Sequence, residues 1–214
     1  LSGINNINNF INDTIIDIND LVTAETNNIT FFHSKKYESL ASKTKATYCI
    51  TTKNLSHILP ASCKPLVVDN VLIVTAKITK TFYPDAVNDN FDEQADDILK
   101  TPLINKVKHG KNILIGKNVT IGQNCFIGHN TIIESNVVIG DNCSIASNVI
   151  LRNTIIGNNV KVLDGCVIGK KGFGFFPGKE KNFRYPHIGL VIIEDNCEIG
   201  CGSTIDRGSL SNTI

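Results

Sequence analysis

The stretch from residue 115 to residue 150 repeats one six-residue unit without a gap, and this repeat constrains the fold more than any other feature. The six units are IGKNVT, IGQNCF, IGHNTI, IESNVV, IGDNCS and IASNVI. An aliphatic residue opens every unit, Asn always stands fourth, and a small or β-branched residue stands fifth. Asn and Gly best tolerate a left-handed backbone. We therefore predict one corner per unit, with the first and fifth positions facing inward.

A six-residue period with a corner in every unit is typical of a β-solenoid, whose short strands stack about 4.8 Å apart. Three units would close one triangular coil. An α-helix is excluded, because this period would place successive aliphatic residues about 240° apart around the helix axis.

The same register extends beyond the six perfect units. It begins faintly at residue 103, slips by one residue at LRNTI (151–155), and returns as IEDNCE at residue 193 after a long interruption. We predict a solenoid domain over 103–214 with an inserted loop at 170–190. The loop is rich in Gly, aromatic and basic residues, which favours a functional role over a tolerated insertion.

Residues 1–84 lack the repeat and are predicted to form a separate small α/β domain. The expected strands lie at 14–18, 29–32, 46–51 and 65–68, and the expected helices at 36–42 and 70–82. Residues 85–102 are acidic in their first part and poor in aliphatic residues. We predict that they form an exposed linker, with Phe91 and Ile98 available to anchor it.

Composition excludes several classes of function. The formal net charge of +1 gives no support to nucleic-acid binding or to a polybasic membrane contact. No apolar stretch approaches the roughly 20 residues of a transmembrane helix, and no signal peptide is visible, so we expect a cytoplasmic protein. The seven Cys include no C-x-x-C pair. Four of them take the small fifth position, where we expect reduced core residues: Cys125, Cys143, Cys166 and Cys197.

Three stretches carry a family resemblance: ITFFHSKKY (29–37), IGKKGFGF (168–175) followed by PHIGLVI (186–192), and TIDRGSL (204–210). The sequence resembles the hexapeptide-repeat acyltransferases, and among them the UDP-3-O-acylglucosamine N-acyltransferases of lipid A synthesis in Gram-negative bacteria. The resemblance spans essentially the whole chain. It implies a mostly β fold, a left-handed parallel β-helix preceded by a small α/β uridine-binding domain.

The resemblance also implies site residues. Phe31 and Tyr37 fall where the family sandwiches the uracil ring. Ser34 falls where the family commonly has Asn to hydrogen-bond the base, and its reach is shorter. Gly172, Phe173 and Gly174 fall in the loop near the active site.

No residue of this chain takes the catalytic position. The family's general base is a His in a repeat that follows TIDRG, so we expect it beyond Ile214 and expect this chain alone to be inactive. His129, in IGHN, imitates the local pattern but precedes the loop, and we expect it to face solvent.

The reaction implied by the resemblance is transfer of a 3-hydroxyacyl chain from acyl carrier protein to the glucosamine amine of the UDP-sugar. The chain would need no metal and no cofactor of its own, because the donor is carried on the phosphopantetheine of acyl carrier protein. The expected partners are acyl carrier protein, the UDP-sugar substrate and two further copies in a homotrimer, with no nucleic acid and at most a peripheral membrane contact. The sequence does not specify the acyl-chain length.

Three alternatives stay open at this point. A metal site of the γ-carbonic-anhydrase kind would need three His from adjacent chains at fixed repeat spacing, and no such His pair is present. A non-catalytic scaffold solenoid would leave the uridine-like segment unexplained. Another hexapeptide-repeat sugar O-acyl- or acetyltransferase is the strongest of the three, and the N-terminal domain argues against it.

Overall fold

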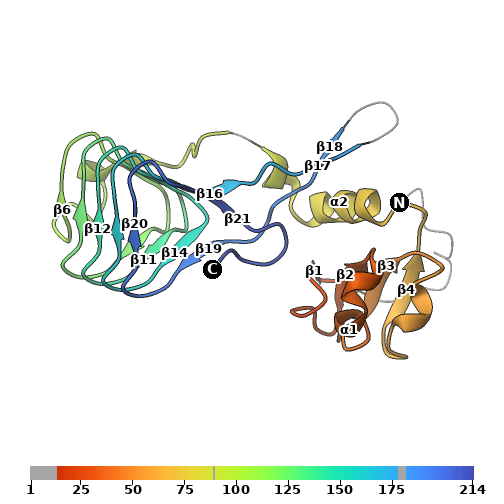
Figure 1. Cartoon of the computed structure of the whole chain (residues 1–214). Helices are drawn as coiled ribbons and strands as arrows, with labels where there is room; N and C mark the ends of the chain where they lie inside the picture. The colour runs from red at the N-terminus through yellow and green to blue at the C-terminus, as the bar shows by residue number, and fades with distance from the viewer. Residues whose placement is uncertain (1–13, 89, 178–181) are drawn as a thin grey trace. The chain divides into compact units, whose positions relative to one another are not determined.

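A computed structural model describes residues 14–214 except 89 and 178–181. Residues 1–13 of the predicted first domain and 178–181 of the predicted loop therefore lie outside the described residues. The chain forms two compact units (Figure 1). One holds the described residues up to Val87 together with Phe173–Pro186, and the other holds Asn88–Gly172 and His187–Ile214.

The first unit is built on a four-stranded sheet in which all strands are parallel, in the order β1-β2-β3-β4. Its strands are β1 (Asp17–Ile18), β2 (Asn28–Phe32), β3 (Tyr48–Thr51) and β4 (Lys64–Val67). Its helices are η2 (Lys35–Tyr37), α1 (Glu38–Ala41), η3 (Ser56–Ile58), α2 (Val71–Phe82) and η4 (Pro84–Val87). The hairpin of β17 (Phe175–Phe176) and β18 (Phe183–Arg184) also belongs to this unit.

Helix α2 forms despite its β-branched content. The Asn70 side chain accepts a hydrogen bond from the N–H of Ile73, a favourable N-cap. The Thr75 hydroxyl donates to the carbonyl of Val71, so this Thr is buried without leaving its hydroxyl unpaired. The helix expected at 70–82 is thus present almost to the residue. None of the helices among the described residues is long and apolar enough to span a membrane.

The second unit is a three-sided parallel β-helix, and three sheets form its sides (Figure 1). Sheet 1, in the order β21-β16-β13-β10-β7-β5, contains β5 (Asp96–Asp97), β7 (Leu114–Ile115), β10 (Ile132–Ile133), β13 (Ile150–Leu151), β16 (Val167–Lys171) and β21 (Thr204–Arg207). Sheet 2, in the order β19-β14-β11-β8, contains β8 (Thr120–Ile121), β11 (Val138–Ile139), β14 (Thr154–Ile156) and β19 (Val191–Ile193). Sheet 3, in the order β20-β15-β12-β9-β6, contains β6 (Lys108–His109), β9 (Phe126–Ile127), β12 (Ser144–Ile145), β15 (Lys161–Val162) and β20 (Glu198–Ile199). The predicted fold class is confirmed.

The corners of the coils lie where the sequence places Asn. All six fourth-position Asn have positive φ, between 55° and 66°: Asn118, Asn124, Asn130, Asn136, Asn142 and Asn148. Their side chains also bond from coil to coil. For example, the Asn124 amide donates to Asn142 Oδ1 at 3.2 Å. Five of these Asn therefore serve both the backbone turn and the stacking of coils: Asn118, Asn124, Asn130, Asn136 and Asn142.

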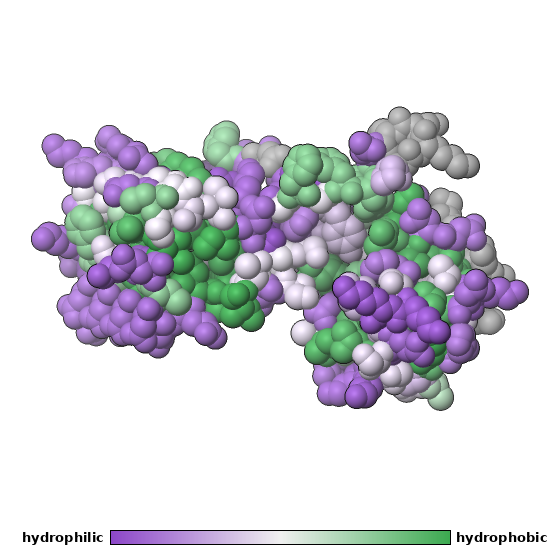
Figure 2. Space-filling view, in the orientation of Figure 1, coloured by the Kyte–Doolittle hydropathy of each residue, from purple (hydrophilic) through white to green (hydrophobic). Residues whose placement is uncertain are grey.

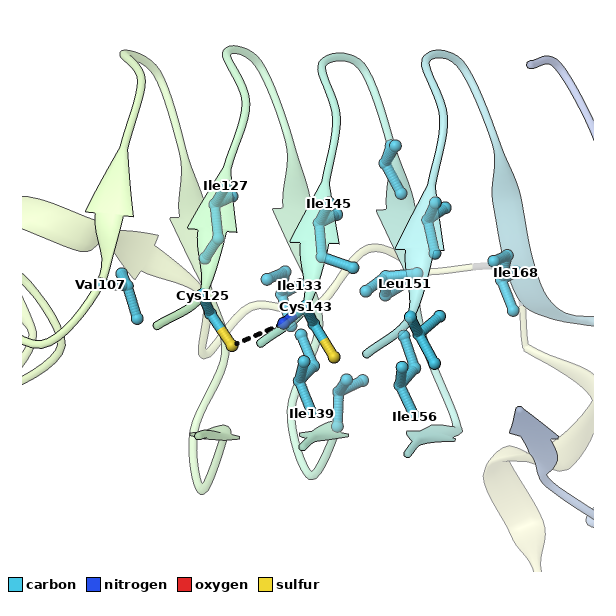
Figure 3. Close-up of a cluster of buried hydrophobic side chains, with 14 of the residues drawn as sticks. Val107, Cys125, Ile127, Ile133, Ile139, Cys143, Ile145, Leu151, Ile156 and Ile168 are labelled. Carbon is cyan, nitrogen blue, oxygen red and sulfur yellow. Dashed lines mark hydrogen bonds between the residues drawn. The ribbon is translucent and has the colours of Figure 1, made fainter. Parts of the chain in front are cut away.

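The unit-opening aliphatic residues form the core, as Figure 3 shows. Ile127, Ile133 and Ile145 are fully buried. Cys residues at the fifth position fill the core with small side chains and also link the coils, because their thiols donate hydrogen bonds to carbonyl groups of the next coil. Cys125 Sγ lies 3.1 Å from the Gly140 oxygen and Cys143 Sγ 3.1 Å from the Gly157 oxygen.

The register slip at LRNTI shortens one coil. Asn153 takes a corner with φ 48°, and the hydrogen bond that joins Asp141 to Asn158 spans 17 residues where the corresponding bond from Gln123 to Asp141 spans 18. A bulge follows at Gly169. Its φ is +83°, and a Cβ there would lie 1.4 Å from the Arg152 carbonyl oxygen, so only Gly fits.

The acidic segment differs from the exposed linker predicted for 85–102. Most of it packs on the β-helix: β5 pairs antiparallel with β7, and Ile98, in the 3₁₀ helix η5 (Ile98–Lys100), is buried at 1% exposure in the solenoid core. The physical reason is that the first coil exposes apolar surface at its open end, which Ile98 and Leu103 cover. Phe91 stays 78% exposed.

The inward-facing positions generate a stability prediction. Ile127→Asp would bury an unpaired charge in the stacked core. It should lower the free energy of unfolding of the β-helix by several kcal/mol, a loss comparable to the whole stability of a domain. Its neighbour Phe126 lies on the same strand but points outward with 39% exposure, so Phe126→Asp is the matched control. Urea unfolding followed by circular dichroism measures both. Equal losses of stability would contradict the assignment of inward and outward faces.

Candidate functional site

An aromatic cluster lies at the carboxyl end of β2 in the first unit. Side chains alternate along a strand, so Phe32, which is fully buried with Ala41 and Cys49, and Phe31 point to opposite faces. Phe31 is only half-buried. Because the sheet is parallel, the carboxyl ends of its strands share one edge, the edge at which open parallel sheets bind ligands.

Three rings form this cluster. The ring centroids of Phe31 and His33 are 5.6 Å apart with planes at 18°, and those of His33 and Tyr37 are 5.8 Å apart with planes at 44°. Among the ring contacts of the described residues, Phe31 and Tyr37 each contact His33 but not each other. Lys36 Nζ lies 5.8 Å from the centre of the Tyr37 ring.

The sequence assigned Phe31 and Tyr37 to the site but not His33. The signal was available: Phe31 and His33 are two residues apart at the end of a strand, and such residues share a face. Partial burial lowers the pKa of His33 below its usual value, which favours the neutral ring near pH 7.

Ser34 has a local structural role. Its backbone is extended, and its Oγ accepts a hydrogen bond of 3.4 Å from the N–H of Lys36, so it caps the 3₁₀ helix that carries Tyr37. The side chain is half-buried. A contact from Ser34 to a nucleotide base stays a prediction.

The predicted loop residues differ in environment. A Cβ on Gly172 would lie 3.0 Å from His187 Nε2 and 3.5 Å from Asp206 Oδ2, so a side chain larger than hydrogen would crowd these two groups. Phe173 is 90% exposed and meets Phe175 edge-on at 4.9 Å. The Gly174 carbonyl accepts from the N–H of Tyr185 at 2.9 Å, which closes the base of the β17–β18 hairpin.

A row of charged side chains follows the strands of Sheet 1, and sequence reasoning missed it. Arg152 pairs with Glu134 at 2.8 Å, both largely buried. Burial raises the pKa of Glu134 although Arg152 opposes this. Burial would also raise the pKa of Asp92, but hydrogen bonds from the hydroxyl and N–H of Ser135 hold it below its usual value. The register of the strands could have revealed the row. Ile133 and Leu151 are paired neighbours in Sheet 1, and Glu134 and Arg152 are the residues that directly follow them.

The solenoid histidines show no catalytic arrangement. His129 is exposed, and its Nδ1 accepts a hydrogen bond of 2.9 Å from the N–H of Lys111. This bond joins one coil to the next. His109 Nδ1 lies 2.9 Å from the carbonyl oxygen of Gly110. Within the described residues no group of three or more His, Cys, Asp or Glu side chains could hold a metal ion. A cavity of about 610 Å³ is lined by Lys106, Lys117 and other residues of 94–119, and no predicted site residue lines it.

Comparison with known proteins finds a family match in each part of the chain. Residues 13–81 match the family UDP-3-O-(3-hydroxymyristoyl) glucosamine N-acyltransferase, LpxD, and residues 118–153 match the bacterial transferase hexapeptide family of six repeats. UDP-3-O-acylglucosamine N-acyltransferase 2 of Legionella pneumophila strain Paris is 44% identical over 204 residues, which cover 94% of this chain and 59% of the relative. The chain is homologous to the UDP-3-O-acylglucosamine N-acyltransferases.

Two further proteins of this kind are similar to the chain. The protein of the same name from Legionella pneumophila strain Philadelphia 1 is 42% identical over 202 residues, covering 94% of this chain and 59% of the relative. The UDP-3-O-acylglucosamine N-acyltransferase of Azorhizobium caulinodans is 44% identical over 68 residues, covering 32% of this chain and 19% of the relative. The chain thus spans about three fifths of the length of the Legionella relatives.

Proposed function

We propose that this chain carries the uridine-recognition part of an N-acyltransferase that acts on UDP-3-O-acylglucosamine in lipid A synthesis. The observation that carries the proposal is the aromatic cluster of Phe31, His33 and Tyr37 at the carboxyl edge of the parallel sheet. It lies in the segment that matches the N-acyltransferase family model. A sugar O-acyltransferase or acetyltransferase of the same solenoid type receives no such support.

In the proposed reaction the glucosamine amine attacks the thioester carbonyl of a 3-hydroxyacyl chain carried by acyl carrier protein. A C–N bond forms, the C–S bond breaks, and the thiol leaves with a proton. A general base that takes the amine proton typically contributes about 10²- to 10⁴-fold to such a step. The bonding of His129 to the backbone of the preceding coil argues against it as this base, and we propose that the base lies outside these 214 residues.

The outer faces of the β-helix support a trimer. Sheet 2 presents aligned aliphatic residues outward, among them Val138 and Ile155 at 39% and 37% exposure, and Sheet 1 presents Leu114, Ile132 and Ile150. Figure 2 shows the hydrophobic residues gathered over β11, β14 and β19. Sheet 3 is more polar, and there Lys161 pairs with Glu198 at 3.6 Å.

Two different apolar faces on one subunit suit a closed ring, in which one face of each copy contacts the other face of the next. Three copies around one axis would use both faces and leave the polar side in solvent. We therefore propose that the β-helix assembles as a homotrimer.

The nucleotide proposal predicts the effect of removing the rings. Replacing Phe31 or Tyr37 by Ala should weaken binding of UDP-N-acetylglucosamine by about 1 to 3 kcal/mol for each ring that stacks on the base. Isothermal titration calorimetry on the 214-residue chain measures the change. Phe91→Ala is the control, because Phe91 is 78% exposed and belongs to the other unit. Unchanged affinity in the Phe31 and Tyr37 variants would contradict the proposal.

The trimer proposal rests on a matched pair of outward residues. Val138 and Phe126 are both 39% exposed, but Val138 lies on the aliphatic Sheet 2 and Phe126 on the polar Sheet 3. Val138→Glu should place a charge in an apolar interface and convert trimers into monomers that stay folded, whereas Phe126→Glu should leave the trimer intact. Sedimentation velocity decides. A monomeric wild type, or dissociation of the Phe126 variant alone, would overturn the proposed arrangement.

A further inference from the structure

The gaps on either side of His33 are too narrow for a nucleobase. A flat base between two rings needs them roughly 7 Å apart, twice the contact distance of about 3.5 Å. The Phe31 and His33 centroids are only 5.6 Å apart, and those of His33 and Tyr37 only 5.8 Å. For the nearly parallel Phe31–His33 pair, the separation of the ring planes cannot exceed that of the centroids, and the His33–Tyr37 pair is tilted by 44° and offers no parallel-sided gap. Neither gap therefore admits a base in this arrangement.

His33 is also the ring that joins the other two, since Phe31 and Tyr37 each contact it and not each other. The ring planes of His33 and Phe31 are nearly parallel, with an angle of 18° between them, so the imidazole stacks on Phe31 much as a base would. His33 is nevertheless exposed to solvent. An exposed side chain changes rotamer on the picosecond to nanosecond timescale, so the ring can leave without any change in the strand.

We propose that His33 occupies the nucleobase position in the free protein and competes with the base, so that a uridine nucleotide binds only when the imidazole ring leaves its place against Phe31 and Tyr37. This inference rests on the proposed uridine-binding function and adds a residue that sets its affinity. The competition is thermodynamic: the binding-competent state is only a fraction of the free protein, and the apparent affinity is reduced by that fraction.

The surroundings of His33 favour a neutral imidazole that is held in place by contacts between ring faces. Its pKa is lowered by partial burial, and no charged neighbour contributes to the shift. Lys36 places its ammonium group over the Tyr37 ring and not over His33 among the cation–ring contacts of the described residues. The imidazole is therefore held by ring contacts, each worth about as much as an aromatic pair, and a base with larger stacking area can displace it.

The test is calorimetric titration of the chain with uridine and, separately, with UDP. Three proteins are compared with wild type: His33→Ala, which empties the position; His33→Phe, which keeps a ring there; and His57→Ala as the control. His57 is an exposed His of the same unit, on η3. Thermal unfolding of each variant shows whether the fold is retained.

Removing the competing ring should strengthen binding of both uridine and UDP by roughly 2- to 10-fold in His33→Ala, because one or two ring contacts no longer have to be broken. His33→Phe should bind no better than wild type, and His57→Ala should match it. Equal or weaker binding of uridine by folded His33→Ala would overturn the proposal. A loss of affinity for UDP alone would also overturn it, because that result assigns His33 to the phosphates.

The two proposals fail in different ways. If neither wild type nor any folded variant binds uridine or UDP, the uridine-binding function itself is wrong and the role of His33 falls with it. If wild type binds and His33→Ala gains nothing, the function stands and only the competition is wrong. Binding by His33→Ala where wild type shows none supports both.

Discussion

The β-helix depends on one constraint, a left-handed backbone conformation at each corner. Most L-residues pay roughly 1 to 2 kcal/mol for this conformation, and Asn is among the few that adopt it. The chain accordingly has Asn with positive φ at the fourth position of all six perfect units. Because the corners recur at equal spacing, the strands between them fall into register, and aliphatic residues meet in the core. The Asn amides then bond from coil to coil, as Asn118 does to Asn136.

Much of the fold could be predicted because each position of the unit has one physical task. The helix from Val71 to Phe82 and the shortened coil at LRNTI were also visible in the sequence. The packing of the acidic segment was not, because what places Ile98 in the core is the open end of the first coil, which only the assembled coils create. The charged row of Glu134 and Arg152 was missed for a different reason: these residues are 18 apart in the chain, and only the register of stacked three-unit coils, which the repeat does predict, makes them neighbours.

The candidate site was predicted only in part, and for a related reason. Family resemblance marked Phe31 and Tyr37, but a resemblance transfers only the positions that match a known pattern. His33 had no assigned role, so its contact with both rings emerged from geometry alone. Ser34 shows the reverse case. Its predicted contact with the base stays a prediction, while the structure gives it a definite task as the cap of the segment that carries Tyr37.

We propose that a uridine nucleotide binds where the three rings meet, and that His33 leaves when it does. The most direct measurement is a crystal structure of the chain with bound UDP-N-acetylglucosamine. We expect the uracil ring in contact with Phe31 and Tyr37, and His33 in a rotamer that no longer stacks on Phe31. A nucleotide bound elsewhere in the chain, or a uracil at this edge with His33 still against Phe31, would contradict it.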